Sequence, residues 1–175
     1  MRKLLLCLIL ATAILPAQAA QFGIGVVGGM NIPIIQEDQG NGTIFGVKGK
    51  LNLIPGVSVE PNLNFAKYGE SKNPYGNRPG SKVTSYGIDA ILGSGLPSVG
   101  VKMYGLIGVG IYSIKRDFDE TLTKIGWATG LGLEVGFMEQ VSVELRGKLN
   151  VISSDGGGSK KSAAVTGGVN YYFGY

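Results

Sequence analysis

The sequence predicts an all-β fold, an eight-stranded antiparallel up-and-down transmembrane β-barrel. Three observations predict it: about eight segments alternate apolar and polar residues at period two, charges fall on only one face of each segment, and the connections are alternately short and long. Beyond the N-terminal segment, no apolar stretch is long and uncharged enough for a membrane helix. A membrane-spanning form must then be a closed barrel, because only helices and closed barrels satisfy the backbone polar groups in hydrocarbon.

The N-terminus has the pattern of a secretory signal peptide. Arg2 and Lys3 form a positive n-region, residues 4–15 are apolar, and Ala17-Gln18-Ala19 fits a small-x-small cleavage site. The apolar run is shorter than the roughly 20 residues of a membrane helix, so we expect cleavage. The predicted organisation is a cleaved signal peptide over residues 1–19 and one barrel domain over residues 20–175.

Each predicted strand spans roughly 10 to 14 residues, the length of a tilted membrane strand with some extension beyond the bilayer. The spacing of turn residues and the alternation set the boundaries. The predicted strands cover residues 22–32, 44–54, 57–68, 83–93, 100–112, 123–137, 141–152 and 162–175.

The first four predicted strands each have an apolar face and an opposite face that carries glycine, polar or charged residues. The second is the clearest, because Phe45 and Leu51 alternate with Lys50 and its neighbours. The first has inward glycines in place of charges. In the third strand Glu60 lies on the inward face, and in the fourth Asp89 does, whereas the outward face of each strand carries an aromatic residue. The outward aromatic residues of this half are Phe22, Phe45, Phe65 and Tyr86.

Pro61 fits this pattern poorly. It lies on the predicted lipid face of the third strand. A proline cannot donate a ladder hydrogen bond, and a barrel has no free edge where that loss is harmless. We therefore expect a β-bulge at Pro61.

The last four predicted strands continue the alternation. The fifth turns Lys102 inward, the sixth opposes its apolar face with Glu134, and the seventh alternates Leu145 with Glu144 and Arg146. The eighth ends on alternate aromatic residues, which is typical of the last strand of a membrane barrel. The outward aromatic residues of this half are Trp127, Phe137, Phe173 and Tyr175.

A soluble β-sandwich would also alternate, with its apolar face as the core. Loop lengths and aromatic positions favour the barrel, because bacterial barrels have short periplasmic turns, longer external loops and two aromatic girdles. Phe22, Phe137, Phe173 and Tyr175 fall at the predicted inner rim, and the other four aromatics at the outer rim. The short connections are residues 55–56, 94–99 and 138–140, and the long ones are residues 35–43, 69–82, 113–122 and 153–161.

With its signal peptide, eight alternating segments and aromatic C-terminus, the chain resembles the small outer-membrane barrel superfamily of the OmpA transmembrane domain and OmpX, often called porin-family proteins. The resemblance implies a bacterial outer-membrane location in a Gram-negative cell envelope. It also implies that Phe173 and Tyr175 form part of the signal read by the barrel-assembly machinery, although Asn170 stands where the motif usually has glycine. We expect a monomer.

The predicted inward charges are of both signs. An eight-stranded barrel is narrow enough for side chains to fill, so we expect a lumen largely plugged by salt bridges. The alternative is a narrow porin-like channel for small solutes or ions, favoured by a modest positive excess and by inward glycines. The predicted lumen charge network is Lys48, Lys50, Glu60, Asp89, Lys102, Lys124, Glu134, Glu144, Arg146 and Lys148.

The composition argues against catalysis and against nucleic-acid binding. The chain contains no histidine, the usual general base beside a serine nucleophile, so we predict no enzymatic activity and no catalytic residue. The single cysteine lies in the signal peptide, and no motif indicates a metal or another cofactor. Once that segment is removed the positive excess is slight and forms no basic stripe.

The function that we predict is structural or surface-interacting, through the external loops. Cations near the outer rim are placed to contact outer-membrane lipid and the phosphates of lipopolysaccharide. The alternative is that they only keep the loops soluble. The candidate lipopolysaccharide contacts are Lys67, Lys72, Arg78, Lys82, Lys115, Arg116, Lys160 and Lys161.

Overall fold

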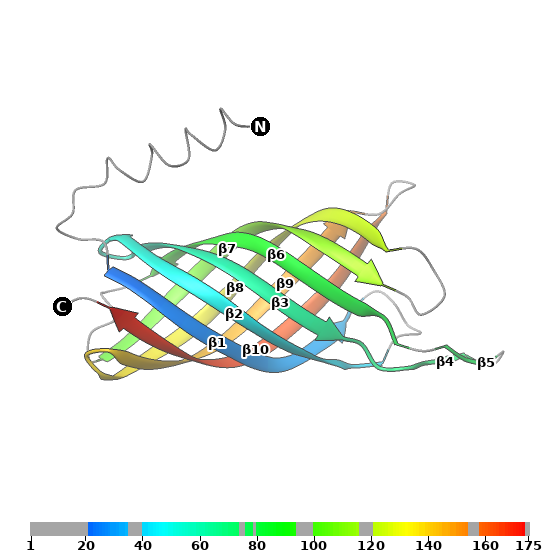
Figure 1. Cartoon of the computed structure of the whole chain (residues 1–175), viewed down its shortest axis with the longest axis horizontal. Helices are drawn as coiled ribbons and strands as arrows, with labels where there is room; N and C mark the ends of the chain where they lie inside the picture. Colours follow the sequence, from blue (N-terminus) through cyan, green and yellow to red (C-terminus); the bar gives the residue numbers. More distant parts are fainter. Residues whose placement is uncertain are drawn as a thin grey trace, which may run out of the picture.

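The computed structural model is a closed β-barrel whose strands are tilted steeply around the axis (Figure 1). It describes residues 21–34, 40–73, 76–78, 80–93, 100–115, 121–153 and 158–173. Around the barrel the order is β1-β10-β9-β8-β7-β6-β3-β2, and all neighbours are antiparallel. The barrel strands are β1 (Gln21–Pro33), β2 (Gly42–Ile54), β3 (Val57–Lys67), β6 (Lys82–Gly93), β7 (Gly100–Lys115), β8 (Leu122–Met138), β9 (Val141–Ser153) and β10 (Ser159–Phe173).

The predicted fold class is confirmed, and the eight predicted strands correspond to the eight barrel strands. Two details differ. β7 continues to Lys115, and β10 begins at Ser159, so both reach further than their alternation suggested. Within one long predicted loop, β4 (Ser71–Asn73) pairs with β5 (Gly76–Arg78) as a separate ribbon that extends beyond the barrel (Figure 1). The predicted signal peptide lies outside the described residues.

The two ends of the barrel differ in their connections. Tight turns at Pro55–Gly56 and Glu139–Gln140 lie at the end where β1 begins and β10 ends, which we call the turn end (Figure 1). The opposite end, which carries the longer connections, is the loop end. Gly56 has a φ of 84°, and an added Cβ would lie 2.6 Å from the Gly93 carbonyl oxygen, so this turn requires glycine.

Burial is inverted relative to a water-soluble protein. Outward apolar side chains are exposed all around the wall, and Leu131 is 74% exposed. Inward charged side chains are buried, and Glu60 is 0% exposed. This arrangement is stable only if the surroundings are apolar, because a continuous apolar surface of this extent is unfavourable in water. No helix in the described ranges is long and apolar enough to cross a membrane.

The bulge that we expected at Pro61 is absent. β3 keeps one register along β6, with Pro61 directly opposite Ile88. Against β2 the pairing stops after Lys48–Asn62 and resumes at Leu51–Val59 in the same register. The missing N–H is therefore accommodated by a local interruption of one ladder without an inserted residue. The described register shifts of the barrel lie instead beside the two tight turns, between Asn52 and Ile54 and between Gly136 and Met138.

Candidate functional site

The centre of the lumen is a compact cluster of paired charges from β2, β3 and β9. Arg146 donates two hydrogen bonds to the Glu60 carboxylate, from Nη1 to Oε1 at 2.5 Å and from Nη2 to Oε2 at 2.9 Å. Its Nη2 is also 3.1 Å from Glu144 Oε1. Lys48 Nζ lies 2.5 Å from Glu144 Oε1 and 3.3 Å from Glu60 Oε2. Two cations and two carboxylates thus neutralise one another.

A second pair continues the cluster on the side of β6. Lys148 Nζ lies 2.7 and 3.0 Å from the two carboxylate oxygens of Asp89. Asp89 is also within 3.8 Å of Arg146 Nη1, which joins this pair to the central cluster. Inward side chains of β2, β3, β6 and β9, which are remote in sequence, meet here because an eight-stranded barrel is narrow.

Glu134 organises the charges nearer the turn end. Lys50 Nζ lies 2.5 Å from Glu134 Oε2, between the rings of Tyr104 and Tyr172 at 5.6 and 5.8 Å from their centroids. The hydroxyls of Ser142 and Tyr172 both donate to Glu134 Oε1. A buried carboxylate is stable only when its oxygens are satisfied in this way.

Two residues of the predicted network lie outside these pairs. Lys102 is 3% exposed and stands opposite Glu134 in register, yet within the described part of the chain it has no ion pair under 4.0 Å. Lys124 is half-buried beside Tyr112 near the loop end of β8. The other eight predicted residues form the pairs described above.

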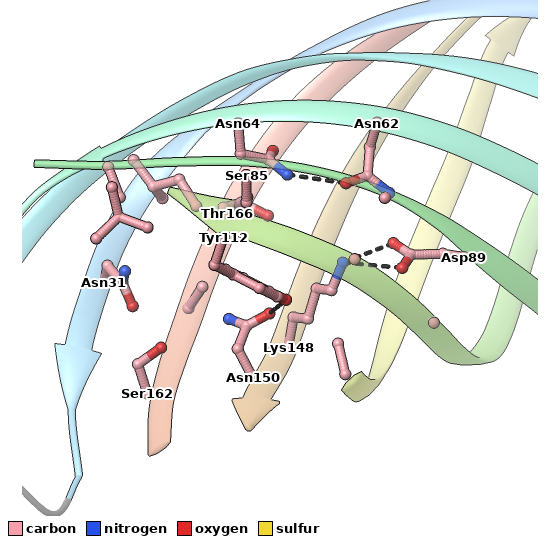
Figure 2. Close-up of a pocket in the computed structure, with 18 of the residues that line it drawn as sticks. Asn31, Asn62, Asn64, Ser85, Asp89, Tyr112, Lys148, Asn150, Ser162 and Thr166 are labelled. Atoms are coloured by element: carbon pink, nitrogen blue, oxygen red, sulfur yellow. Dashed lines mark hydrogen bonds and ion pairs between the residues drawn. The ribbon is translucent and has the colours of Figure 1, made fainter. Parts of the chain in front are cut away.

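Towards the loop end the lumen opens into a cavity of about 50 Å³ that is lined by both polar and apolar side chains (Figure 2). Its base is the Lys148–Asp89 pair, and Tyr112 Oη donates to Asn150 Oδ1 at 3.2 Å in its wall. That volume corresponds to only a few water molecules. Amide and hydroxyl groups face the cavity, and those labelled in Figure 2 are Asn31, Asn62, Asn64, Ser85, Tyr112, Asn150, Ser162 and Thr166.

Apolar clusters lie inside the barrel towards both ends, which the alternation rule did not predict. At the turn end, Ile91 packs with Tyr104 and Leu106. A larger cluster at the loop end is formed by residues in or next to β3 and in β6, β7 and β9, with Ile44 of β2 packed against it. Its buried members are Ala66, Tyr68, Val83, Tyr112, Ile114 and Ile152. The signal was present in the sequence, because Tyr112 and Ile114 share the inward face of Lys102.

Inward glycines make room for the tyrosine rings. An added Cβ at Gly23 would lie 2.8 Å from Tyr172 Cδ1, and one at Gly126 would lie 2.8 Å from Tyr112 Cε2. These positions are filled by aromatic side chains, so they provide packing space and no open pore. No group of three or more His, Cys, Asp or Glu side chains among the described residues is arranged to hold a metal ion.

A family model described as "Outer membrane protein beta-barrel domain" matches residues 4–174. The chain belongs to this family. It is therefore an integral outer-membrane protein, its apolar wall faces lipid, and its turn end is the periplasmic end. No curated protein sequence matches the chain.

Solved structures support the same fold for this outer-membrane protein at low sequence identity. Neisserial surface protein A is 16% identical, with a TM-score of 0.69 over 87% of this chain and 97% of that chain. The N-terminal barrel domain of Pseudomonas aeruginosa OprF is 18% identical, with a TM-score of 0.57 over 88% and 99%. Yersinia pestis Ail, in complex with the heparin analogue sucrose octasulfate, is 15% identical, with a TM-score of 0.52 over 89% and 98%.

The aromatic residues predicted to form girdles are exposed on the lipid face wherever they are described. At the periplasmic end, Phe22 stacks on Phe173 across the β1–β10 seam at 5.6 Å, and Phe137 is exposed near the end of β8. In the outer halves of their strands lie Phe45, Phe65, Tyr86 and Trp127. Tyr175 lies outside the described residues.

The predicted lipopolysaccharide contacts divide into three groups. Lys67, Lys82, Lys115 and Lys161 are exposed at the loop end. Lys160 is half-buried and lies on the same face of β10 as Ser162 and Ala164, which face the lumen. The remaining three cannot be placed: Arg116 lies outside the described residues, as do the side chains of Lys72 and Arg78.

Proposed function

We propose that this outer-membrane protein is a monomeric, non-conducting scaffold that presents its outer rim and external loops for contact with lipid or partner molecules. The observation that supports it best is the filling of the lumen. Paired charges extend through it from Lys50–Glu134 to Lys148–Asp89, one apolar cluster packs beside them towards the turn end, and a second lies at the loop end. The cavity that the network and the outer cluster line together has a volume of only about 50 Å³.

The paired charges and the apolar clusters oppose ion passage for different physical reasons. An ion at the centre must displace a paired charge such as Arg146 from Glu60, which leaves an uncompensated buried charge. Apolar constrictions exclude water, so they also exclude hydrated ions. The names of two structural neighbours, a surface protein and an attachment invasion locus protein, agree with a role at the cell surface.

Planar-bilayer recording of the refolded protein tests this proposal. The wild-type barrel is expected to give no reproducible openings, and Lys161→Gln, a change on the exposed rim, is the matched control. Arg146→Met and Lys50→Met each remove one cation from the plug. Reproducible wild-type openings whose size changes in these two variants, but not in the control, would contradict the closed scaffold.

The second candidate is the narrow channel for small solutes or ions. The cavity of Figure 2 favours it, because a space lined in part by amide, hydroxyl and charged groups already lies in the outer half of the lumen. Conduction then requires the central pairs to separate and the apolar residues at both ends to move aside. The recording described above decides between the two candidates.

We infer a non-catalytic role from the serine environments. Ser142 is fully buried and donates to Glu134 at 2.5 Å, so substrate has no access to its hydroxyl. Ser85 lines the small cavity, and the chain has no histidine to activate it. Incubation of the refolded barrel with phospholipid and lipid A, followed by mass spectrometry, is expected to give no hydrolysed product.

We also propose that residues 1–19 are removed on export and that Phe173 with Tyr175 contributes to recognition by the barrel-assembly machinery. The measured mass of the protein purified from outer membranes should correspond to a chain that begins at Ala20. Phe173→Ala should lower the amount of assembled barrel in cells yet refold normally in detergent, whereas Phe137→Ala should do neither. Equal assembly of both variants would contradict the recognition role.

A further inference from the structure

Three lysines stand side by side at the loop end of the barrel. Lys67 on β3 is directly opposite Lys82 on β6, and Lys82 is directly opposite Lys115 on β7. All three are exposed and lie on the outward faces of their strands, the faces that also carry Phe65, Thr84 and Ser113. We call Lys67, Lys82 and Lys115 the lysine row.

The lysine row is unfavourable for the isolated protein. Directly opposed residues of antiparallel strands have Cβ atoms about 4.5–5.5 Å apart, and like charges at such positions are destabilising. Within the described residues, no carboxylate forms an ion pair with any of the three ammonium groups, whereas the inward Lys48, Lys50 and Lys148 each have at least one carboxylate partner. An anion from outside the chain would remove the repulsion.

The rows beneath the lysine row change from polar to apolar in order. The next outward row across β3, β6 and β7 is Phe65, Thr84 and Ser113. Below it the registers continue with Leu63, Tyr86 and Ile111, and then with Pro61, Ile88 and Val109. These last two rows line an apolar groove on the lipid face. Cations, then hydroxyls, then an apolar groove match an anionic headgroup above acyl chains.

We propose that the lysine row binds the phosphate groups of an acylated glycolipid of the outer leaflet, lipid A, whose acyl chains lie along the groove below. The charges supply headgroup selectivity, and Thr84 and Ser113 can donate hydrogen bonds to phosphate or sugar oxygens. The site rests on the proposed scaffold function and names one partner for its outer rim. It also selects three cations from the larger set around that rim.

Lys161 provides a matched control. It is an exposed lysine at the same end of the barrel, on β10, but its described cross-strand partner is Val151. A single surface cation attracts anions weakly, whereas adjacent cations near an anionic membrane surface add their contributions. The proposal therefore predicts different effects for one kind of substitution at two positions.

The experiment measures lipid A retained by the barrel in nanodiscs made from phosphatidylcholine with and without lipid A. The variants are K67Q/K82Q/K115Q, K67R/K82R/K115R and K161Q. The Gln triple variant is expected to bind lipid A on the order of 10- to 100-fold more weakly than wild type. The Arg triple variant and K161Q should stay within about twofold, because each keeps the row of charges.

Three further measurements make the outcome decisive. Dephosphorylated lipid A should bind the wild type as weakly as lipid A binds the Gln triple variant, and inorganic phosphate alone should compete poorly because it lacks acyl chains. Unchanged retention by the Gln triple variant, or equal retention of dephosphorylated lipid A, overturns the proposal. Heat-modifiable migration shows that each variant is folded. If the protein does not conduct and its lipid A retention does not depend on the lysine row, only the proposed lipid A site is contradicted. If the protein conducts and its lipid A retention depends on the lysine row, only the non-conducting scaffold is contradicted.

Discussion

Lysine side chains occupy two opposite environments in this barrel. In the lumen, Lys48 and Lys50 are buried and lie 2.5 Å from carboxylates. At the rim, Lys67, Lys82 and Lys115 are exposed and face one another. The contrast follows from solvation: a charge removed from water must be matched by the protein itself, whereas a charge at the interface can be matched by the membrane. Substitutions in the two regions should consequently differ in size and in sign.

Loss of Arg146 should have the largest effect. Arg146→Met removes the guanidinium that holds both oxygens of Glu60 and one of Glu144, and leaves two carboxylates with Lys48 alone. Breaking a buried ion pair on one side costs about 3–5 kcal/mol. Urea unfolding in lipid vesicles, followed by tryptophan fluorescence from Trp127, measures the difference. A loss below about 1 kcal/mol would show that the lumen charges are already solvated.

Removal of the partner as well should recover much of that loss. Arg146→Met with Glu60→Met leaves Lys48 and Glu144, which are 2.5 Å apart and neutralise each other. Replacement of a complete buried pair by apolar side chains is often neutral or stabilising. The double variant is expected to be more stable than Arg146→Met by about 2 kcal/mol or more in the same unfolding assay. Additive losses would argue against direct coupling of the two residues.

A neutral hydrogen bond in the cavity should matter less. Tyr112→Phe removes the bond from Tyr112 Oη to Asn150 Oδ1 at 3.2 Å and keeps the ring within the apolar cluster at the loop end. The expected cost is about 1 kcal/mol, typical of one hydrogen bond. Water in the cavity can replace the lost donor, so a cost near zero would indicate a well-hydrated wall. Lys161→Gln serves as the control for unspecific surface effects.

The rim should give the smallest effect, and of opposite sign. Lys82→Gln removes the central member of the lysine row and with it both repulsive contacts. In detergent without lipid A the variant should be more stable by about 0.2–1 kcal/mol. In bilayers that contain lipid A the gain should vanish or reverse. Destabilisation in both media would mean that Lys82 has a structural role within the barrel wall.

Much of this molecule was predictable from local pattern. The alternation in β2 is complete enough to assign Lys48 and Lys50 to the lumen and Phe45 to lipid, and burial agrees at all three positions. Partners were not predictable, because Arg146 and Glu60 meet only once the barrel closes. The lysine row was hidden for the same reason, since it requires the register of β3, β6 and β7.

Where the sequence interpretation went wrong, a general rule was applied too strictly. Proline was expected to force a bulge, yet the ladder beside Pro61 is only interrupted. The lumen was expected to be filled largely by salt bridges, yet apolar side chains such as Ile91 and Ile114 are also buried there. Neither departure changes which strands pair. Local exceptions of this kind are tolerated because the alternation along each whole strand keeps its register fixed.

The seam between β1 and β10 has a consequence for synthesis of the protein. β1 pairs with β10, from Phe22–Phe173 to Pro33–Ser162, so β1 has no neighbour on that side until β10 has been synthesised. A chain that stops before β10 leaves two open edges, which lipid cannot satisfy. An early stop codon thus abolishes the entire wall, however many strands precede it, and only finished copies can reside in the bilayer.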